Sequence, residues 1–476
     1  MKYTFRSLWI VAVAASIGAA QGQAWEKPIA PGVTYRMEVD LAIPRIIHAL
    51  RFSMGSPTVK MVPELGSGVV YQENSTKGRE TVTDMVTRTG ALAGVNADFF
   101  PFTGDPLGVM VRDGRLVSVP STQRAVFGWG QNTATQALVG FKGTVEVNGT
   151  KLELDGLNEE CPVNKMVLNT DVTSLAMSKT PCVHAVLTMD DASWAPNGTY
   201  TGTFQSIFKD AAKLPIQPGN AILTASGTKT PLLENLVPGQ KVSISFSTTG
   251  FDWSKIDQTV GGGPFLVKDG QLSVDADKEG FNDAFTNKRH PRTAIGKTVD
   301  GDIWLVVVDG RQKISDGATL PEMGKVMLKL GCTDAINLDG GGSSALNILG
   351  LTLSRPSDGR ERPVANGVLI MGPKPVPSTD IFAIKAPSKL VVGTPTTVQV
   401  LDSQGVIVPN AEVLWSSLGD AWIDQGGLIR PFRRGKMDVS ALVRGQLVKA
   451  TIDVVDPEKP ATPPKAARKT KKAKRA

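Results

Sequence analysis

Short alternating runs of apolar and polar residues recur along the chain and predict β-strands joined by tight turns. Residues 91–100 form an apolar run typical of a buried strand, and residues 109–119 predict a hairpin that turns at Asp113-Gly114. Two further strands, 293–298 and 302–309, are separated by a short turn. With 49 Gly and 31 Pro among 476 residues, the composition also favours strands and turns over helices.

Helical periodicity is confined to a few segments. A short helix is predicted over 83–89, and a longer one over 320–330, where apolar residues share one face. Thr319 and Glu322 form a capping box at the start of the longer helix. A strand over 333–339 follows, so the order strand, helix, strand predicts that part of the sheet is parallel.

These patterns divide the chain into a large domain and a small one. Residues 25–371 are predicted to form an α+β domain with a strand-rich mixed sheet, and the Pro-rich segment 372–380 to be an extended connector. Residues 381–456 contain short strands at regular spacing and predict a small all-β sandwich. That segment resembles bacterial Ig-like domains at Val398, Val400, Trp415, Gly426, Gly427 and Val439.

The first residues of the chain have the pattern of a secretory signal peptide. Lys2 and Arg6 precede an apolar run, and small residues follow, with cleavage predicted at Ala24 or Ala20. An uncleaved membrane anchor is the alternative. No later stretch is apolar over the ~18 residues that a membrane-spanning helix needs. Residues 1–24 therefore predict an extracytoplasmic protein, in the periplasm, secreted or at the cell surface.

The basic character of the chain belongs to its end. The net charge is +7, but residues 465–476 hold seven Lys or Arg, and removing these together with Lys2 and Arg6 leaves −2 for residues 25–460. Residues 457–476 are predicted to be a disordered tail, either simply solvated or bound to an anionic surface. No pattern for specific nucleic-acid recognition is present.

Three cysteines bear on the compartment. In an oxidising environment Cys161 and Cys182 are predicted to form a disulfide, which leaves Cys332 as a buried free thiol. Their spacings do not fit a zinc site.

The most informative motif is the run of three glycines in DGGGSS, from Asp339 to Ser344. It lacks the Lys-Ser/Thr of a phosphate-binding P-loop, and the segment after it is too short for the helix of a dinucleotide-binding fold. A serine hydrolase of the nucleophile-elbow type needs a histidine after the serine, and none follows His290. The remaining readings are a nest of glycine amides that binds an anion beside a carboxylate, or a tight turn without a ligand.

A second cluster, RHPRT, is predicted to sit at the start of a strand. Arg292 is suited to bidentate phosphate binding and His290 to proton transfer. Arg289 and Arg292 as ordinary surface charges are the alternative.

Six segments in order resemble the phosphodiester glycosidase family. They are GVNADFF (94–100), GGGPFLVKDG (261–270), RHPRTAIG (289–296), WLVVVDGRQ (304–312), GCTDAINLDGGGSSAL (331–346) and RPSDGRERPVANGVLI (355–370). The resemblance implies hydrolysis of the bond between the anomeric carbon of a sugar and a phosphodiester, which yields a free sugar and a phosphomonoester.

Matched position by position, the resemblance implies a site with two kinds of residue. Asp339, His290 and Asp309 are the predicted catalytic residues, with Asp339 favoured as the carboxylate that acts on the sugar. The predicted substrate and phosphate ligands are Arg292, Asn96, Asp98, Gly340, Gly341, Gly342 and Ser343. A divalent cation held by the acids and Asn96 is the one cofactor considered.

The sequence thus predicts an exported hydrolase of glycosyl phosphodiesters, acting on an envelope or extracellular polysaccharide. The alternative is a surface protein that binds carbohydrate or phosphate without catalysis. The two differ in whether Asp339 is needed for turnover.

Overall fold

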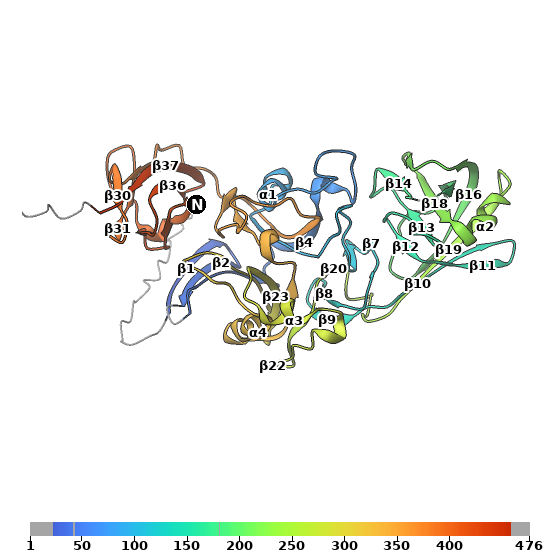
Figure 1. The fold of residues 1–476 in the computed structure, drawn as a ribbon, viewed down its shortest axis with the longest axis horizontal. Helices are drawn as coiled ribbons and strands as arrows, with labels where there is room; N and C mark the ends of the chain where they lie inside the picture. The colour runs from blue at the N-terminus through green and yellow to red at the C-terminus, as the bar shows by residue number, and fades with distance from the viewer. Residues whose placement is uncertain (1–21, 41–42, 180, 458–476) are drawn as a thin grey trace, which may run out of the picture.

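The computed structural model describes residues 22–40, 43–179 and 181–457, and it shows an elongated, strand-rich molecule (Figure 1). The predicted signal peptide and basic tail fall largely outside these residues. The helices of the described part are α1 (Val82–Thr89), α2 (Thr230–Glu234), α3 (Asp283–Asn287) and α4 (Leu320–Lys329). No helix among the described residues is long and apolar enough to cross a membrane.

The centre of the molecule is an eight-stranded sheet. Its order is β1 (Gln23–Ala30), β2 (Val33–Asp40), β3 (Arg45–Ser53), β24 (Asp302–Val308), β23 (Arg292–Thr298), β25 (Cys332–Leu338), β21 (Phe265–Lys268) and β22 (Gln271–Leu272). Every pairing in this sheet is antiparallel. Strands β24 and β25, which flank α4 in the chain, run in the same direction as predicted, but they do not pair with each other because β23 lies between them and pairs antiparallel with both.

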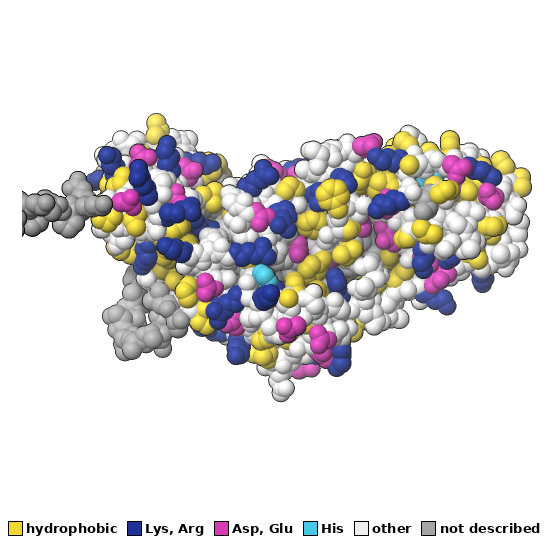
Figure 2. Space-filling model, in the orientation of Figure 1, with side chains coloured by type: hydrophobic (Ala, Val, Ile, Leu, Met, Phe, Trp, Pro, Cys, Tyr) yellow, Lys and Arg dark blue, Asp and Glu magenta, His cyan; other side chains and the backbone are white. Residues whose placement is uncertain are grey.

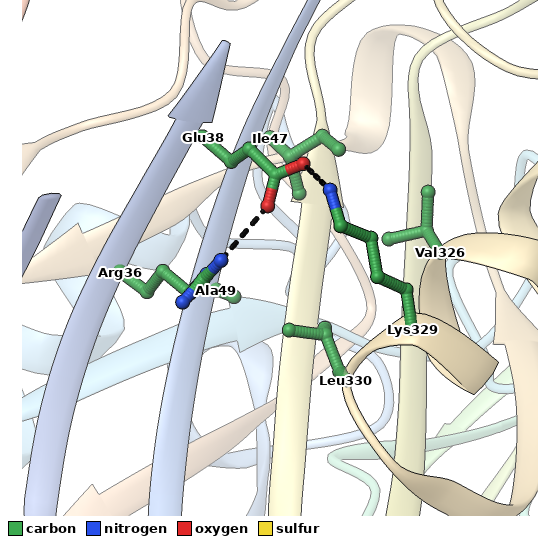
Figure 3. Close-up of a pocket in the computed structure, with 7 residues that line it drawn as sticks. All are labelled: Arg36, Glu38, Ile47, Ala49, Val326, Lys329 and Leu330. Carbon is green, nitrogen blue, oxygen red and sulfur yellow. Dashed lines mark hydrogen bonds and ion pairs between the residues drawn. The ribbon is translucent and has the colours of Figure 1, made fainter. Parts of the chain in front are cut away.

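Helix α4 covers one face of this sheet as its apolar stripe predicts. Thr319 and Glu322 form the capping box, and Leu320, Met323 and Met327 are buried. At the other end of the helix Lys329 pairs with Glu38 of β2, which also accepts a hydrogen bond from Arg36 (Figure 3).

Two five-stranded sheets lie next to the central sheet. One has the order β27 (Leu351–Thr352), β26 (Leu346–Ile348), β5 (Ala93–Asn96), β28 (Asn366–Met371) and β4 (Lys60–Leu65). The other has the order β7 (Arg115–Ser118), β6 (Met110–Arg112), β20 (Gln258–Gly261), β8 (Ala125–Trp129) and β9 (Ala134–Leu138). Side chains of all three sheets share one hydrophobic core, which fixes the ends of β5, β23 and β25 relative to one another.

A separate β-lobe, which the sequence patterns did not reveal, is inserted within residues 25–371 (Figure 1). Its mixed sheet has the order β11 (Thr150–Leu154), β10 (Phe141–Val147), β19 (Lys241–Thr248), β16 (Gly198–Lys209), β15 (Cys182–Met189), β18 (Asn220–Ser226), β13 (Met166–Asn169) and β12 (Gly156–Leu157). The short pair β14 (Leu175–Met177) and β17 (Lys213–Pro215) belongs to the same segment. A second hydrophobic core, built mainly from this lobe, holds it together.

The predicted disulfide is not formed. Cys161, Cys182 and Cys332 are free and buried. The sulfur of Cys161 contacts the carbonyl oxygens of Lys165 and Thr224, whereas that of Cys182 contacts His184 and the carbonyl of Ala211, so the two thiols have different partners.

Residues 381–456 form a small all-β module with a core of its own. Its sheets are β30 (Lys389–Val391), β37 (Gln446–Val455), β36 (Gly435–Val443) and β33 (Val413–Gly419); β31 (Thr396–Thr397), β35 (Leu428–Pro431) and β34 (Ala421–Ile423); and the pair β29 (Ala383–Lys385) and β32 (Gln399–Leu401). The resemblance to Ig-like domains remains a prediction. The module is docked, since Leu414, Trp422 and Leu442 belong to the central core and Lys27 of β1 donates to the carbonyl oxygens of Asn410 and Val413.

Candidate active site

Strand pairing brings the predicted site residues together from distant parts of the chain. Asp339 directly follows β25, and Arg292 opens β23. Because Thr293 pairs with Leu338 across these two strands, Arg292 and Asp339 lie next to each other at the same end of the sheet. Asp98 arrives there from the end of β5, since the backbone amide of Asp339 donates to the carbonyl of Ala97.

Asp339 lies where two cavities meet. The larger, here called the aromatic cavity, has a volume of about 480 Å³ and is lined by Phe99, Phe100, Leu107, Arg124, Gly280, Phe281, Asn282, Phe285, Asp339 and Arg362. The smaller, here called the arginine cavity, has a volume of about 190 Å³ and is lined by Phe285, His290, Arg292, Arg311, Asp339, Gly340, Gly341, Gly342 and Arg362. Lys and Arg side chains gather near the middle of the face shown in Figure 2, over the central sheets.

The carboxyl group of Asp339 is tuned toward neutral pH. Burial raises its pKa to about 6, although Ser343, the Gly340 amide and Arg362 each lower it. Oδ1 accepts a hydrogen bond of 2.8 Å from the Gly340 amide. A carboxylate with a pKa near 6 is ionised at neutral pH and basic enough to take a proton, which is what a general base requires.

Asp98 is a second buried carboxyl group beside the first. Burial raises its pKa to about 7, two backbone amides oppose this shift, and the charge of Asp339 adds to it. Its oxygens accept hydrogen bonds from the amides of Phe99 and Gly108, each at 2.7 Å. Asp98 lines neither the aromatic nor the arginine cavity.

His290 faces the arginine cavity and is held neutral. Burial first, and then the charges of Arg292, Arg311 and Lys288, lower its pKa below the ordinary value of 6.5. Nδ1 lies 3.3 Å from Nη2 of Arg311. A guanidinium only donates hydrogen bonds, so Nδ1 accepts and the proton of the neutral ring is on Nε2.

Arg292 lines the arginine cavity with a guanidinium that the protein itself holds. Nε donates to the carbonyl of Ala318 at 2.9 Å, and Nη2 donates to the carbonyls of Phe285 and Lys288. The side chain is buried, and burial together with Arg311 lowers its pKa to about 10. Arg292 therefore supplies a fixed positive charge and also anchors the end of α3.

Asn96 uses its side-chain amide on the protein itself and lines neither cavity. It is buried, donates to the carbonyl of Asp339 at 2.7 Å and accepts from Thr293 Oγ1 and the Ala345 amide. It thereby ties β5 to β23 and to the loop after β25.

Ser343 has no comparable partner. Its buried Oγ has no hydrogen-bond partner at good geometry among the described residues, but it lies near enough to Asp339 to lower the pKa of that carboxyl group.

The three glycines after Asp339 make room mainly for protein groups. A Cβ at Gly340 would lie 2.8 Å from the carbonyl oxygen of Pro291, and one at Gly342 would collide with Asp358 and Arg362. Gly341 has a φ of 64° and lies under Arg311. Two of the three amides are already engaged, Gly340 with Asp339 and Gly341 with Pro291, so the predicted anion nest is largely filled from within.

Asp309, the third predicted catalytic residue, is elsewhere. Its carboxylate is buried and accepts from the backbone amide of Arg355 at 2.9 Å, and it lies 3.3 Å from Nε2 of His48. It lines neither the aromatic nor the arginine cavity. The sequence could not separate it from Asp339, because both acids directly follow apolar strands of the same sheet.

Arg311, Arg362, Arg124 and the phenylalanines are site residues that the sequence interpretation did not select. Arg311 and Arg362 stand inside quoted motifs, in WLVVVDGRQ and RPSDGRERP, so their residue type was the available signal. Phe281 and Phe285 stack with ring centroids 4.8 Å apart, and the guanidinium of Arg124 lies 4.4 Å from the Phe281 centroid. Nothing in their local sequence indicated this cluster.

The donors near Asp339 do not form a metal site. No group of three or more His, Cys, Asp or Glu side chains is arranged to hold an ion anywhere in residues 22–40, 43–179 and 181–457. Asp98 and Asn96 use their polar atoms on backbone and side-chain groups of the protein. The residues present thus do not fit the divalent cation considered from the sequence.

Solved structures share this fold. A hypothetical protein from Synechocystis superimposes with a TM-score of 0.62 and 20% identity, covering 74% of this chain and 64% of that chain. A Burkholderia pseudomallei K96243 protein, named as exported, has a TM-score of 0.58 and 23% identity, covering 69% of this chain and 74% of that chain. These similarities establish the fold alone.

Sequence relatives are more specific. The SPbeta prophage-derived protein YomE of Bacillus subtilis is 32% identical over 164 residues, which are 34% of this chain and 24% of YomE. The N-acetylglucosamine-1-phosphodiester alpha-N-acetylglucosaminidase of Bos taurus is 33% identical over 110 residues, 21% of each protein, and the human enzyme matches to the same extent. The matches thus span about a quarter or less of each relative. Residues 190–371, which include Arg292, Arg311, Arg362, Asp339 and the three glycines, match the family of phosphodiester glycosidases.

Proposed function

We propose that this protein hydrolyses glycosyl phosphodiesters, releasing a free sugar and a phosphomonoester. The observation that carries this proposal is the position of Asp339, which lines an aromatic cavity on one side and an arginine-rich cavity on the other. A sugar phosphate likewise has two parts, a sugar that would lie in the aromatic cavity and a phosphate that would lie in the arginine cavity, and they are joined at the anomeric carbon. The match of residues 190–371 to the phosphodiester glycosidases supports the same reaction.

The arginine cavity suits the phosphate. Arg292, Arg311 and Arg362 surround it. Arg362 is paired with Asp358, whereas Arg311 has no carboxylate partner among the described residues. Arginine binds phosphate through parallel N–H donors, and the low dielectric of a partly buried site strengthens the attraction. His290 lines the same cavity, and a bound anion would stabilise its protonated form.

The aromatic cavity suits the sugar. Phe99, Phe281 and Phe285 contact one another, with centroid distances of 4.8 to 5.9 Å, and present ring faces and edges to the cavity. The apolar face of a pyranose packs on such rings, and the polar groups of Asn282, Arg124 and Arg362 are available to its hydroxyls. A volume of about 480 Å³ holds a monosaccharide with room to spare.

With the substrate across both cavities, Asp339 stands beside the anomeric carbon. In the proposed step a water oxygen bonds to that carbon as the bond to the phosphate oxygen breaks, and the bonding pair leaves with the phosphate. The carboxylate of Asp339 takes the proton from the water and passes it to solvent or product. Phosphate is a good leaving group, so stabilising its charge with the three arginines meets the main demand.

Export is part of the proposal. The N-terminal pattern of Lys2, Arg6 and an apolar run predicts a signal peptide, and a sugar polymer of the envelope or the surroundings would then be the substrate. Strand β1 starts at Gln23 and pairs with β2 from its first residue. Cleavage at Ala20 leaves this strand whole, whereas cleavage at Ala24 removes its first pairs, so Ala20 is the proposed site.

The test is release of reducing sugar from a panel of sugar-1-phosphodiesters that includes UDP-N-acetylglucosamine. The purified protein is compared with Asp339→Asn, which keeps an acceptor for the Gly340 amide, and with Asp300→Asn, an exposed acid in the turn between β23 and β24. Release by the wild type and by the Asp300 variant, but not by the Asp339 variant, supports the proposal. Saturable binding without release in all three proteins overturns it in favour of a binding protein.

A further inference from the structure

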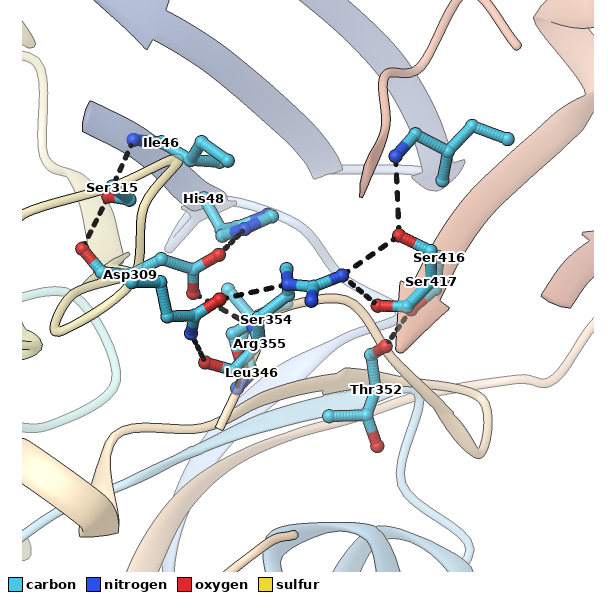
Figure 4. A network of polar contacts seen from close by, with 12 residues as sticks. Ile46, His48, Asp309, Ser315, Leu346, Thr352, Ser354, Arg355, Ser416 and Ser417 are labelled. Carbon is cyan, nitrogen blue, oxygen red and sulfur yellow. Dashed lines mark hydrogen bonds and ion pairs between the residues drawn. The ribbon is translucent and has the colours of Figure 1, made fainter. Parts of the chain in front are cut away.

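Arg355 is one of the residues that join the C-terminal module to the rest of the molecule, and it reaches the module with both terminal nitrogens of its guanidinium. Nη1 donates to the carbonyl of Ser417 at 3.0 Å (Figure 4). It also donates to the carbonyl of Ala421 at 3.0 Å, and Nη2 donates to the carbonyl of Gly419 at 2.8 Å. The side chain is 9% exposed. A buried guanidinium costs several kcal/mol of desolvation unless its donors are satisfied, so these carbonyls fix where Arg355 lies.

The same residue is bonded to the segment that carries Arg311. Nε of Arg355 donates to Oε1 of Gln312 at 2.9 Å, and Nε2 of Gln312 donates back to the carbonyl of Arg355 at 2.8 Å. The amide of Arg355 is held by Asp309, which immediately precedes this segment. Gln312 is the residue next to Arg311, so the pair of hydrogen bonds sets the backbone beside an arginine of the arginine cavity.

Arg311 needs such support because its backbone is in an unfavourable conformation. Its φ is 58°, in the left-handed region that a side chain other than glycine seldom adopts. Conformations of this kind cost about 1–3 kcal/mol and persist only where the surroundings enforce them. The local hydrogen bonds are few, from the Arg311 amide to Asp316 at 3.3 Å and between Gln312 and Ser315.

Arg355 also begins the segment that carries Arg362, and the module holds this segment at a second point. Ser416 of the module donates to the carbonyl of Thr352 (Figure 4). The Thr352 hydroxyl in turn donates to Glu361, which also accepts from the amide and hydroxyl of Thr83 in α1. Glu361 is therefore bonded to Thr352, which is itself bonded to Ser416 of the module. Arg362 is the next residue after Glu361.

We propose that the C-terminal module is a positioning element of the candidate active site, acting through Arg355 on Arg311 and Arg362. The module contributes no residue to either cavity. Its carbonyls orient Arg355, and Arg355 with Gln312 holds Arg311 over Gly341 and against His290. The importance of this arrangement for hydrolysis rests on the proposed function, but the arrangement itself is measurable without turnover.

The test uses His290 as a reporter in the full chain. The chain has three histidines, of which His48 and His184 are buried and His290 is partly exposed. NMR titration follows all three imidazoles, and substitution of each histidine in turn assigns its signal. In Arg355→Gln the midpoint of His290 is expected to rise toward 6.5, because Arg311 moves away while Arg292 and Lys288 remain. The matched control is Arg444→Gln, an exposed arginine that pairs with Glu412 inside the module.

A second variant guards against misfolding. Gln312→Met keeps the volume of the side chain and leaves the bonds of Arg355 to the module, but removes both links to Arg355. It is expected to raise the His290 midpoint like Arg355→Gln and to weaken the binding of dimethyl phosphate at least threefold. Unchanged His290 midpoints in both variants would overturn the inference, even if the enzyme is active. A raised midpoint in a protein that hydrolyses nothing would support the inference and count only against the proposed function.

Discussion

Nδ1 of His290 lies 3.3 Å from Nη2 of Arg311, and both residues line the arginine cavity. Because Arg311 donates, His290 is neutral in this arrangement, and a proton on Nδ1 would face a guanidinium. Arg292 and Lys288 add to the same field. These positive charges disfavour the protonation of His290, and a bound anion would offset them.

The first prediction concerns proton uptake on anion binding. Dimethyl phosphate carries one charge and has no group that titrates near neutral pH, so any change in protonation comes from the protein. Its binding is expected to raise the NMR midpoint of His290, since the anion offsets the charges that lower the pKa of His290. By linkage, affinity for dimethyl phosphate must then increase as pH falls through the histidine midpoint. Equal midpoints with and without saturating anion would contradict this placement of the phosphate.

The second prediction is a pH limb set by Asp339. The base must be ionised, and burial raises the pKa of Asp339 to about 6. Thus kcat/KM is expected to rise with pH through about 6 and to lose about tenfold for each pH unit below it. The measurement is kcat/KM from pH 4.5 to 8 on a sugar-1-phosphodiester whose own phosphate stays ionised throughout. A flat profile across pH 5 to 7 would remove Asp339 from the role of base.

The third prediction separates two neighbouring arginines. Arg362 lines both cavities, whereas Arg360 is exposed and lines neither. Loss of a charged hydrogen bond to phosphate costs about 1.5–3 kcal/mol, so Arg362→Gln is expected to weaken substrate binding by about 10- to 100-fold. Arg360→Gln, the same change two residues away, should leave KM within about twofold. Similar effects of the two substitutions would point to general electrostatic attraction rather than to a bound phosphate.

The fourth prediction tests the sugar side. Phe285 lines both cavities and stacks on Phe281. Aromatic packing of this kind contributes about 1 kcal/mol, so Phe285→Ala is expected to raise the inhibition constant of the free product sugar by roughly fivefold. Phe102, which is 76% exposed and outside both cavities, supplies the control Phe102→Ala. A sugar that inhibits all three proteins equally does not occupy the aromatic cavity.

The fifth prediction concerns Gly261, which packs against the carboxyl group of Asp98. A Cβ at Gly261 would collide with Oδ2 of Asp98 and lie 2.6 Å from Cα of Gly108. Overpacking of this kind costs about 1–3 kcal/mol, so Gly261→Ala should lower the free energy of unfolding in urea by that amount. Gly55→Ala, where no atom lies within 4 Å of the added Cβ, should change it by less than about 0.5 kcal/mol. An equally stable Gly261 variant would mean that Asp98 is not enclosed as described.

The local sequence was sufficient wherever short-range chemistry decides the structure. The capping box of Thr319 and Glu322 and the apolar stripe after it are enough to specify α4, and the structure confirms both. The dipeptide Asp113-Gly114 similarly specifies a hairpin turn, with φ values of 50° and 76° that suit this pair. Asp339, directly after an apolar strand, and His290 and Arg292, at the start of another, were candidates from sequence position and residue type.

Strand order decided what the sequence could not. Asp309 and Asp339 each follow an apolar strand of one sheet, but β25 ends at the two cavities and β24 ends at the module, so Asp339 lines the cavities and Asp309 does not. The three glycines were predicted to be a place where other groups come close to the backbone, and this is confirmed. Among those groups are Arg311, Asp358 and Arg362, which lie outside the segment formed by β25 and the glycines. The sequence determined which residue types were available and where strands, caps and turns begin. Only long-range pairing decided which of them meet, because backbone hydrogen bonds between strands fix neighbours irrespective of their separation along the chain.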